Sequence, residues 1–359
     1  MNYLRSVFGK KQFILAITGA ISLIVFLILT TICCVTASKQ KNQQFAKRWC
    51  NDGSYVQLSA FLSELSGMEE KTVMMIQGGL ENQLTMDSIV APNENARRVV
   101  MAYSAQGEVE LSSGKSEVTV NAYGVGGDFF LFHPLEIVYG SYFDGDDIMK
   151  DHVILDTETA WNLFGSPNVV GQVITVGGRQ HVISGVVKKE KGRLNDLAGN
   201  DVPTIFVSLE SLQEFGNITY LNSIEALLPN PISGYAKGIF QKALNLEERR
   251  FEVVENTGRF SWQHLVMNAK NFGLRGMNKK GLVYPYWENV ARGTEDILTP
   301  ICIAAIVFVS YPSILLIALL IRMWRKRTIH KKDVWNFIQA KLEDYRESRR
   351  RRIEDNEYE

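Results

Sequence analysis

The sequence predicts an α+β domain outside the cytoplasm, held between two transmembrane α-helices. Residues 12–38 and 297–321 contain no charged side chain and are rich in Ile, Leu, Val and Phe. A helix of about 20 apolar residues crosses the hydrocarbon core of a bilayer. Between the two runs, β-rich segments alternate with segments of helical spacing. This pattern is typical of mixed or antiparallel sheets with helices packed on them.

The overall composition conceals an uneven distribution of charge. The 359 residues carry 39 Lys and Arg and 39 Asp and Glu, so no basic excess exists that would bind nucleic acid by bulk charge. Residues 39–296 carry 24 basic and 31 acidic side chains, whereas the segment after residue 321 is basic. Because Lys and Arg accumulate on the cytoplasmic side of membrane proteins, we expect a plasma-membrane protein with both termini in the cytoplasm.

This interpretation divides the chain into five parts. These are a cytoplasmic N-terminus (1–11), a first span (12–38), an extracytoplasmic domain (39–296), a second span (297–321) and a basic amphipathic cytoplasmic tail (322–359). The first apolar run also resembles a signal peptide, because basic residues precede it and small residues follow it. Its apolar stretch is longer than that of a signal peptide, which favours an uncleaved anchor.

The first half of the predicted domain is expected to be rich in strands. Apolar spacing predicts a helix over residues 54–65, and a β-rich run predicts a strand over 72–76 that ends at Gly78. Further antiparallel strands are predicted at 97–103, 108–111 and 117–123.

The second half alternates strands and helices. Asp156 is a suitable N-cap for a helix over 157–164 that Gly165 ends. Gly177 and Gly178 form a two-residue hairpin turn. The remaining predictions are strands at 152–155, 173–176, 180–187, 204–208, 219–228 and 251–255, and helices at 209–215, 235–244 and 261–271. We expect two subdomains with the helices on one side of the sheets.

No sequence pattern indicates catalysis or cofactor binding. Gly114-Lys115-Ser116 resembles the end of a phosphate-binding loop, but Val109 occupies the position of the required earlier glycine. The five His do not fall at the spacing of metal ligands, and the acidic loop 144–151 lacks the ligand order of a calcium loop. We therefore expect neither an enzyme nor a bound metal or cofactor.

Residues 123–187 carry the most specific pattern in the chain, a set of glycines and apolar residues around one acid. Its members are Gly124, Val125, Asp128, Phe129, Phe130, Gly140, Leu163, Phe164, Gly165, Gly171 and Gly185. The pattern resembles the periplasmic core domain of MacB-type and FtsX-type ABC transporter permeases, and the resemblance extends over residues 13–321. Glycines of this kind serve turns and close packing, so the resemblance identifies a structural module.

The resemblance implies a function in an ABC system. Such permeases are dimers with four spans in each chain, and they work with an ATPase that is fused or separate. Because this chain contains two spans and no ATPase sequence, we expect a separate ABC ATPase and a homodimer or a heterodimer with a four-span permease. The expected function is that of a permease-like subunit in export or mechanotransmission. The alternative is a membrane-tethered binding or scaffold protein without transport activity.

Six residues are candidates for coupling motion between the membrane and the domain: Glu288, Asp296, Pro312, Arg322, Arg325 and Trp335. The two acids lie in a segment expected to enter the second span as a stalk. The proline lies in the middle of that span, where it is expected to kink the helix. The last three begin a tail with apolar residues at helical spacing, which suits a helix on the anionic inner leaflet, a helix docked on a partner, or a solvated tail.

Overall fold

The computed structural model describes residues 10–91, 96–114, 116–144, 149–216, 218–247, 249–271, 282–326 and 331–356. The chain forms two compact units. One is Thr30–Ile303, called the sheet unit below. The other combines Met1–Leu29 with Ala304–Glu359 and is called the helical unit.

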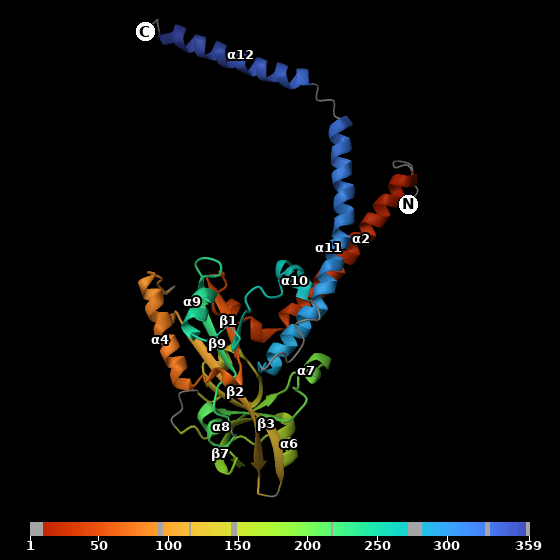
Figure 1. Cartoon of the computed structure of the whole chain (residues 1–359). Coiled ribbons are helices and arrows are strands. Elements are labelled where there is room, and N and C mark those ends of the chain that lie inside the picture. The colour runs from red at the N-terminus through yellow and green to blue at the C-terminus, as the bar shows by residue number, and fades with distance from the viewer. Residues whose placement is uncertain are drawn as a thin grey trace. The chain divides into compact units, whose positions relative to one another are not determined.

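The sheet unit is built on one mixed sheet of ten strands (Figure 1). The strands are β1 (Tyr55–Leu62), β2 (Val100–Ser112), β3 (Glu117–Gly127), β4 (Glu136–Gly140), β5 (His152–Asp156), β6 (Val173–Val176), β7 (Arg179–Lys188), β8 (Thr204–Ser208), β9 (Ser223–Pro229) and β10 (Phe251–Glu255). Their order is β10-β1-β9-β2-β3-β8-β5-β7-β4, with β6 beside β2 and β7. β3–β8 and β5–β7 are parallel, and the remaining described pairs are antiparallel. The predicted α+β class with mixed pairing is confirmed, and the two expected subdomains share this single sheet.

Helices cover both faces of the sheet rather than the one side that we expected. Successive residues of a strand point to opposite faces. Accordingly, Met101 belongs to a first core beneath α4, α6, α8 and α9, whereas Val100 and Ala102 belong to a second core beneath α3, α5 and the start of α11. The helices are α2 (Lys10–Ser38), η1 (Lys41–Gln43), α3 (Phe45–Trp49), η2 (Glu64–Ser66), α4 (Glu70–Met86), α5 (Phe129–Phe132), α6 (Thr157–Phe164), α7 (Arg193–Leu197), α8 (Leu209–Phe215), α9 (Tyr235–Leu244), α10 (Trp262–Asn268), η3 (Ala269–Asn271), α11 (Tyr286–Lys326) and α12 (Lys331–Asn356).

Two sequence predictions are wrong. In both segments the spacing of the buried residues along the chain differs from the spacing that was inferred. Strand β1 occupies the segment predicted as a helix. All eight of its residues are buried, because it lies between β9 and β10 and is covered on both faces, so its sequence lacks the polar alternation of a half-exposed strand. Helix α4 occupies the segment predicted as the strand 72–76. Its buried residues Val73, Ile76, Leu80 and Leu84 recur every three or four positions, and Gly78 lies inside it.

The capped helix and the hairpin are confirmed. An Asp156 carboxylate oxygen accepts a hydrogen bond from the amide of Thr159 at 2.5 Å, and α6 ends at Gly165 in the left-handed conformation. Gly177 and Gly178 both have positive φ, as a primed hairpin turn requires. The predicted elements 204–208, 209–215, 235–244 and 251–255 coincide with β8, α8, α9 and β10, and β2 joins the two strands predicted within 97–111.

Two helices are long and apolar enough to cross a membrane, over Phe13–Ser38 and Tyr286–Arg322. Within the helical unit, Ser22 of α2 donates a hydrogen bond to the carbonyl of Phe308 in α11 at 2.7 Å. Pro312 has no N–H to donate to this carbonyl four residues earlier. Ser22 therefore satisfies a carbonyl that Pro312 leaves without its helix partner, and α11 continues past Pro312 to Lys326.

Candidate functional site

The start of α11 carries three charged residues on one face. Glu288, Arg292 and Glu295 follow one another at intervals of four and three, which places them on the same side of a helix. All three are buried. A charged side chain is rarely buried unless it is paired. With two acids and one base on this face, a cation from the sheet unit is needed as a partner.

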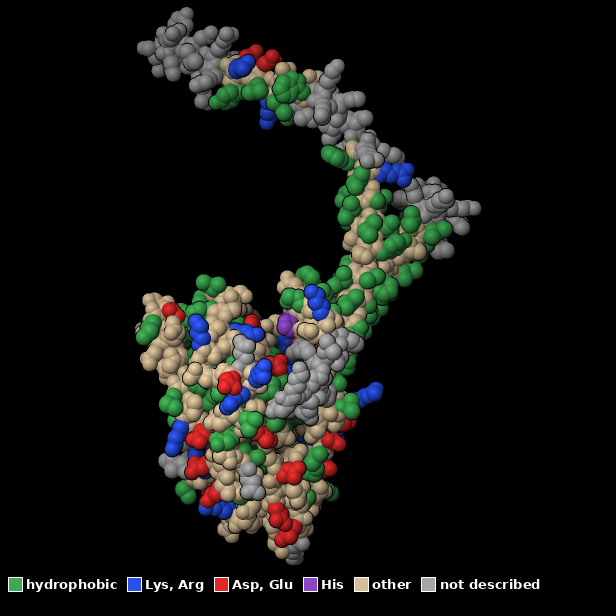
Figure 2. Space-filling model, in the orientation of Figure 1, with side chains coloured by type: hydrophobic (Ala, Val, Ile, Leu, Met, Phe, Trp, Pro, Cys, Tyr) green, Lys and Arg blue, Asp and Glu red, His purple; other side chains and the backbone are tan. Residues whose placement is uncertain are grey.

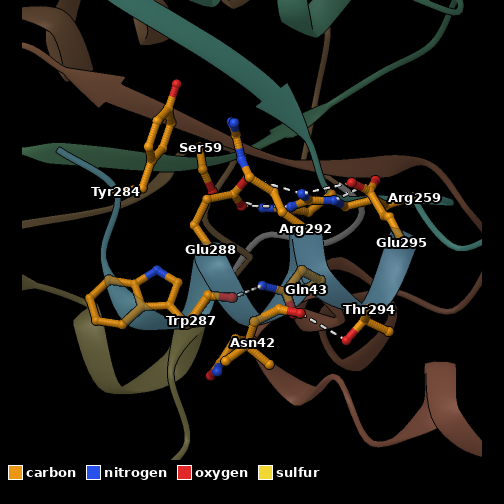
Figure 3. A network of polar contacts seen from close by, with 12 residues as sticks. Asn42, Gln43, Ser59, Arg259, Tyr284, Trp287, Glu288, Arg292, Thr294 and Glu295 are labelled. Atoms are coloured by element: carbon orange, nitrogen blue, oxygen red, sulfur yellow. Dashed lines mark hydrogen bonds and ion pairs between the residues drawn. The ribbon is translucent and has the colours of Figure 1, made fainter. Parts of the chain in front are cut away.

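That partner is Arg259, which lies between β10 and α10 and is 1% exposed. Its guanidinium donates to both Glu288 oxygens at 2.6 and 2.9 Å and to both Glu295 oxygens at 2.8 and 3.2 Å. A fifth bond, at 3.2 Å, reaches Asn256. Figure 3 shows Arg259 directed at the two carboxylates of α11. Two bidentate pairs on one guanidinium fix its position more strictly than a point charge would.

Arg292 closes the cluster on its other side. Its Nε donates to Glu288 at 2.6 Å, and its guanidinium lies 3.1 Å from a Glu252 oxygen of β10. The same group lies over the ring of Tyr284, 3.9 Å from its centroid, and the Tyr284 hydroxyl donates to Glu252 at 2.5 Å. Burial and this hydrogen bond raise the pKa of Tyr284.

Arg259, Glu288, Arg292 and Glu295 together form what we call the Arg259 cluster, with two positive and two negative groups. Burial by itself lowers the pKa of Arg259, but the charges of Glu288 and Glu295 outweigh burial and raise it. The guanidinium therefore stays charged at any pH that the protein meets. The cluster is electrically balanced, and each member depends on the others for its charge to be tolerated.

A chain of buried polar groups extends from the cluster into the sheet. Asn256 donates to the hydroxyl of Ser59 in β1 at 2.7 Å. That hydroxyl donates to Glu225 in β9, and the other Glu225 oxygen contacts Nε2 of His133. The polar contacts thus run without interruption from the middle of the sheet to α11.

Apolar packing holds the same turn of α11. Trp287 lies in the second core, with its ring 4.3 Å from that of His133 and 5.7 Å from that of Phe129. On the backbone side, Gln43 donates to the Trp287 carbonyl at 3.4 Å, and Gln40 donates to Thr294 at 3.1 Å. The start of α11 is therefore anchored by ion pairs on one side and by aromatic packing on the other.

Comparison with known protein families identifies the family to which this chain belongs. The family described as "MacB-like periplasmic core domain" matches residues 13–233. The chain belongs to this family.

Its relatives include "Macrolide export ATP-binding/permease protein MacB" of Agrobacterium fabrum, 40% identical over 81 residues, covering 21% of this chain and 12% of the relative. The protein of the same name from Hyphomonas neptunium is 24% identical over 152 residues, covering 42% of this chain and 23% of the relative. The chain thus spans under a quarter of the length of these relatives.

Two solved structures align with part of this chain at low sequence identity. The periplasmic region of MacB from Actinobacillus actinomycetemcomitans aligns with a TM-score of 0.38 and 15% identity, covering 56% of this chain and 89% of that chain. The extracellular domain of the noncanonic ABC-type transporter YknZ from Gram-positive bacteria aligns with a TM-score of 0.36 and 12% identity, covering 55% of this chain and 99% of that chain. As a member of the MacB-like family with two helices able to span a membrane, the chain is a membrane protein with an extracytoplasmic domain.

The MacB-like pattern residues hold the sheet unit together. At Gly140, which has a left-handed φ of 74°, an added Cβ would collide with the carbonyl of Ser184. Asp128 forms a bidentate ion pair with Arg97 at 2.7 and 2.9 Å. The other members lie in turns or in close packing: Gly124, Val125, Phe129, Phe130, Leu163, Phe164, Gly165, Gly171 and Gly185. Phe129 also packs against Trp287 at the start of α11.

The six coupling candidates are divided between the two units. Glu288 lies in the Arg259 cluster, and Asp296 is half-buried one residue after Glu295. The others belong to the helical unit: Pro312, Arg322, Arg325 and Trp335. Of these, Arg322 and Trp335 are exposed, and the Arg325 side chain lies outside the described residues.

Sequence reasoning missed Arg259, Arg292, Glu225 and His133. The spacing of Glu288, Arg292 and Glu295 was the available signal, since three charges on one face just before an apolar run call for buried partners. Over the described residues, no group of three His, Cys, Asp or Glu is placed to hold a metal ion. The acidic loop weighed as a calcium site has residues 145–148 outside the described part of the chain.

Proposed function

We propose that the chain is a permease-like membrane subunit of a MacB/FtsX-type ABC system and works with an ATPase supplied as a separate protein. Family membership supports the permease assignment. The observation that carries the coupling role is the anchoring of α11, whose first turns are fixed in the sheet unit by the Arg259 cluster and whose later turns are apolar enough to cross the membrane.

The proposed mechanism is mechanical. A helix transmits displacement along its axis when its end is fixed rather than loosely packed. Removing one partner of a buried ion pair costs about 3–5 kcal/mol, so the Arg259 cluster resists separation of α11 from the loop after β10. Movement of α11 driven from the cytoplasmic side would then be passed to β1, β9 and β10 through the buried polar chain.

The proposed topology places both termini in the cytoplasm and the sheet unit outside. Cys50, in the sheet unit, forms a hydrogen bond with Asp52 at 3.1 Å and is half-buried. A membrane-impermeant thiol reagent should label Cys50 in intact cells, and Cys50→Ser should abolish the labelling. Labelling that requires cell lysis would contradict this orientation.

The tail is proposed to contact the ATPase or a second permease. Helix α12 exposes several apolar side chains, among them Trp335, Phe337, Ile338, Leu342 and Tyr345. The permease would act as a homodimer or as a heterodimer with a four-span permease, as the resemblance to dimeric permeases implies.

The test is a pull-down of the full-length chain from gently solubilised membranes, followed by mass spectrometry. A stoichiometric ABC ATPase is the expected result. Trp335→Ala should weaken its recovery, whereas Trp161→Ala, an equally exposed Trp in the sheet unit, should not. Repeated recovery of an envelope or secreted protein without any ATPase would overturn the proposal in favour of a tethered binding protein.

A further inference from the structure

Helix α10 (Trp262–Asn268) has an apolar outer surface. Trp262 is 63% exposed, Val266 38% and Met267 65%. Lys270 follows and is exposed as well. Figure 2 shows hydrophobic side chains gathered over this helix. Exposed apolar residues are normal when single, but three on one short helix call for a partner surface.

The inner side of α10 indicates where this helix lies. Leu265 is buried in a small core with Leu298 and Cys302 of α11, against which Cys33 and Ala37 of α2 also pack. All of these residues belong to the sheet unit. Helix α10 therefore packs on the outer ends of the two helices that are able to span the membrane.

The depth of this contact follows from helix geometry. The residues of α11 and α2 in this contact lie one to five residues inside the two apolar runs, from Leu298 to Cys302 in one run and from Cys33 to Ala37 in the other. At 1.5 Å per residue, the contact lies about 2–8 Å inside the ends of these runs. Interfacial helices bury their apolar face about 5–10 Å into the boundary between headgroups and acyl chains.

We propose that α10 is a membrane-surface anchor whose outer face lies in the headgroup region of the outer leaflet. Trp is enriched at this level because its ring is apolar and its N–H is polar, and a neighbouring Lys reaches the lipid phosphates. Arg259, which binds α11, lies three residues before Trp262. The anchor would therefore keep the loop that carries Arg259 at a fixed distance from the bilayer. This inference depends on the membrane location of the chain and not on an ATPase.

The test measures the environment of α10 in the full-length chain in lipid nanodiscs. In a background of Cys33→Ala, Cys34→Ala, Cys50→Ser and Cys302→Ala, single cysteines replace Trp262, Val266 or Met267 and carry a spin label. Trp161→Cys, on α6, is the matched aqueous control. The three α10 labels should show a several-fold higher ratio of oxygen to nickel-chelate accessibility than the control.

Two results would overturn the anchor. Labels on α10 that are as accessible to the nickel chelate as the control would place this face in water. Labels that are immobilised and shielded from both reagents would mean that a second copy or another protein covers it.

A second measurement leaves the native cysteines in place. Brominated lipids quench tryptophans that contact the bilayer. The quenched fraction of intrinsic fluorescence should fall in Trp262→Phe relative to the unsubstituted protein, and it should not fall in Trp161→Phe. An equal quenched fraction in the two variants would contradict the proposal. Neither experiment involves nucleotide or a partner, so failure here leaves the proposed ABC function to its own test.

Discussion

Replacing Arg259 by Met removes the cation on which both carboxylates of α11 depend. The variant loses five hydrogen bonds, two to Glu288, two to Glu295 and one to Asn256. Within the Arg259 cluster the charge changes from zero to −1. Glu288 keeps its bond to Arg292. Glu295 loses both contacts with the Arg259 guanidinium and therefore accounts for most of the destabilisation.

The expected loss is about 3–5 kcal/mol in the free energy of unfolding, the range for breaking a fully buried ion pair by removing one partner. Arg259→Lys should lose less, since the charge remains and only the planar fork is lost. The double variant Arg259→Met/Glu295→Gln restores neutrality in the cluster, with one cation and one anion left. It should recover a large part of the loss, because an uncompensated buried charge is the main cost of the single change.

The assay is urea unfolding of the full-length protein in mild detergent, followed by tryptophan fluorescence. Trp287 lies in the second core and reports on the start of α11. A loss below about 1 kcal/mol for Arg259→Met, in the range of a solvent-exposed pair, would refute the view that the cluster is buried and interdependent. A double variant no more stable than the single one would refute the charge argument.

Three further outcomes test the fold. Leu80→Ala, in the buried stripe of α4, should cost about 2–5 kcal/mol, while Met75→Ala on the exposed side should change stability by less than about 0.5 kcal/mol; similar losses in urea unfolding would contradict the helix assignment. Gly140→Ala should destabilise by collision with a backbone carbonyl, whereas Gly78→Ala inside α4, with open space around it, should stabilise by about 0.5–1 kcal/mol. Burial lowers the pKa of His181, so the unfolded state binds its proton more readily and the melting temperature should fall as the pH drops below about 6.5. His181→Gln should flatten this pH dependence, and an unchanged slope would contradict its assignment to His181.

Much of the sheet unit could be predicted because its signals are local. The cap at Asp156, the stop at Gly165 and the Gly177-Gly178 turn act within a few residues, and the elements around them have the predicted bounds. Strand β1 and helix α4 were mispredicted because their burial depends on distant partners. β1 pairs on both edges with strands that follow it by more than 150 residues, and no local sequence pattern indicates this pairing.

The site could be predicted only in part for the same reason. Glu288 was a candidate because it precedes the second span. Arg259 has no local feature that marks it as buried, and its role appears only when the loop after β10 meets α11. Glu225, a buried acid in the middle of a strand of mostly apolar residues, was a signal that sequence reasoning missed. A charge in such a place requires partners, here Ser59 and His133.

In the proposed mechanism, α11 transmits motion into the sheet unit through the Arg259 cluster. The direct measurement is the response to ATP of a fluorescent probe on Cys50, in full-length protein reconstituted with the proposed ATPase and with the three membrane-segment cysteines replaced by Ala. We expect an ATP-dependent change in emission that is lost in Arg259→Met/Glu295→Gln, while the double variant still binds the ATPase. An ATP response of the same size in the double variant, or no response in the protein with the intact cluster, would contradict it.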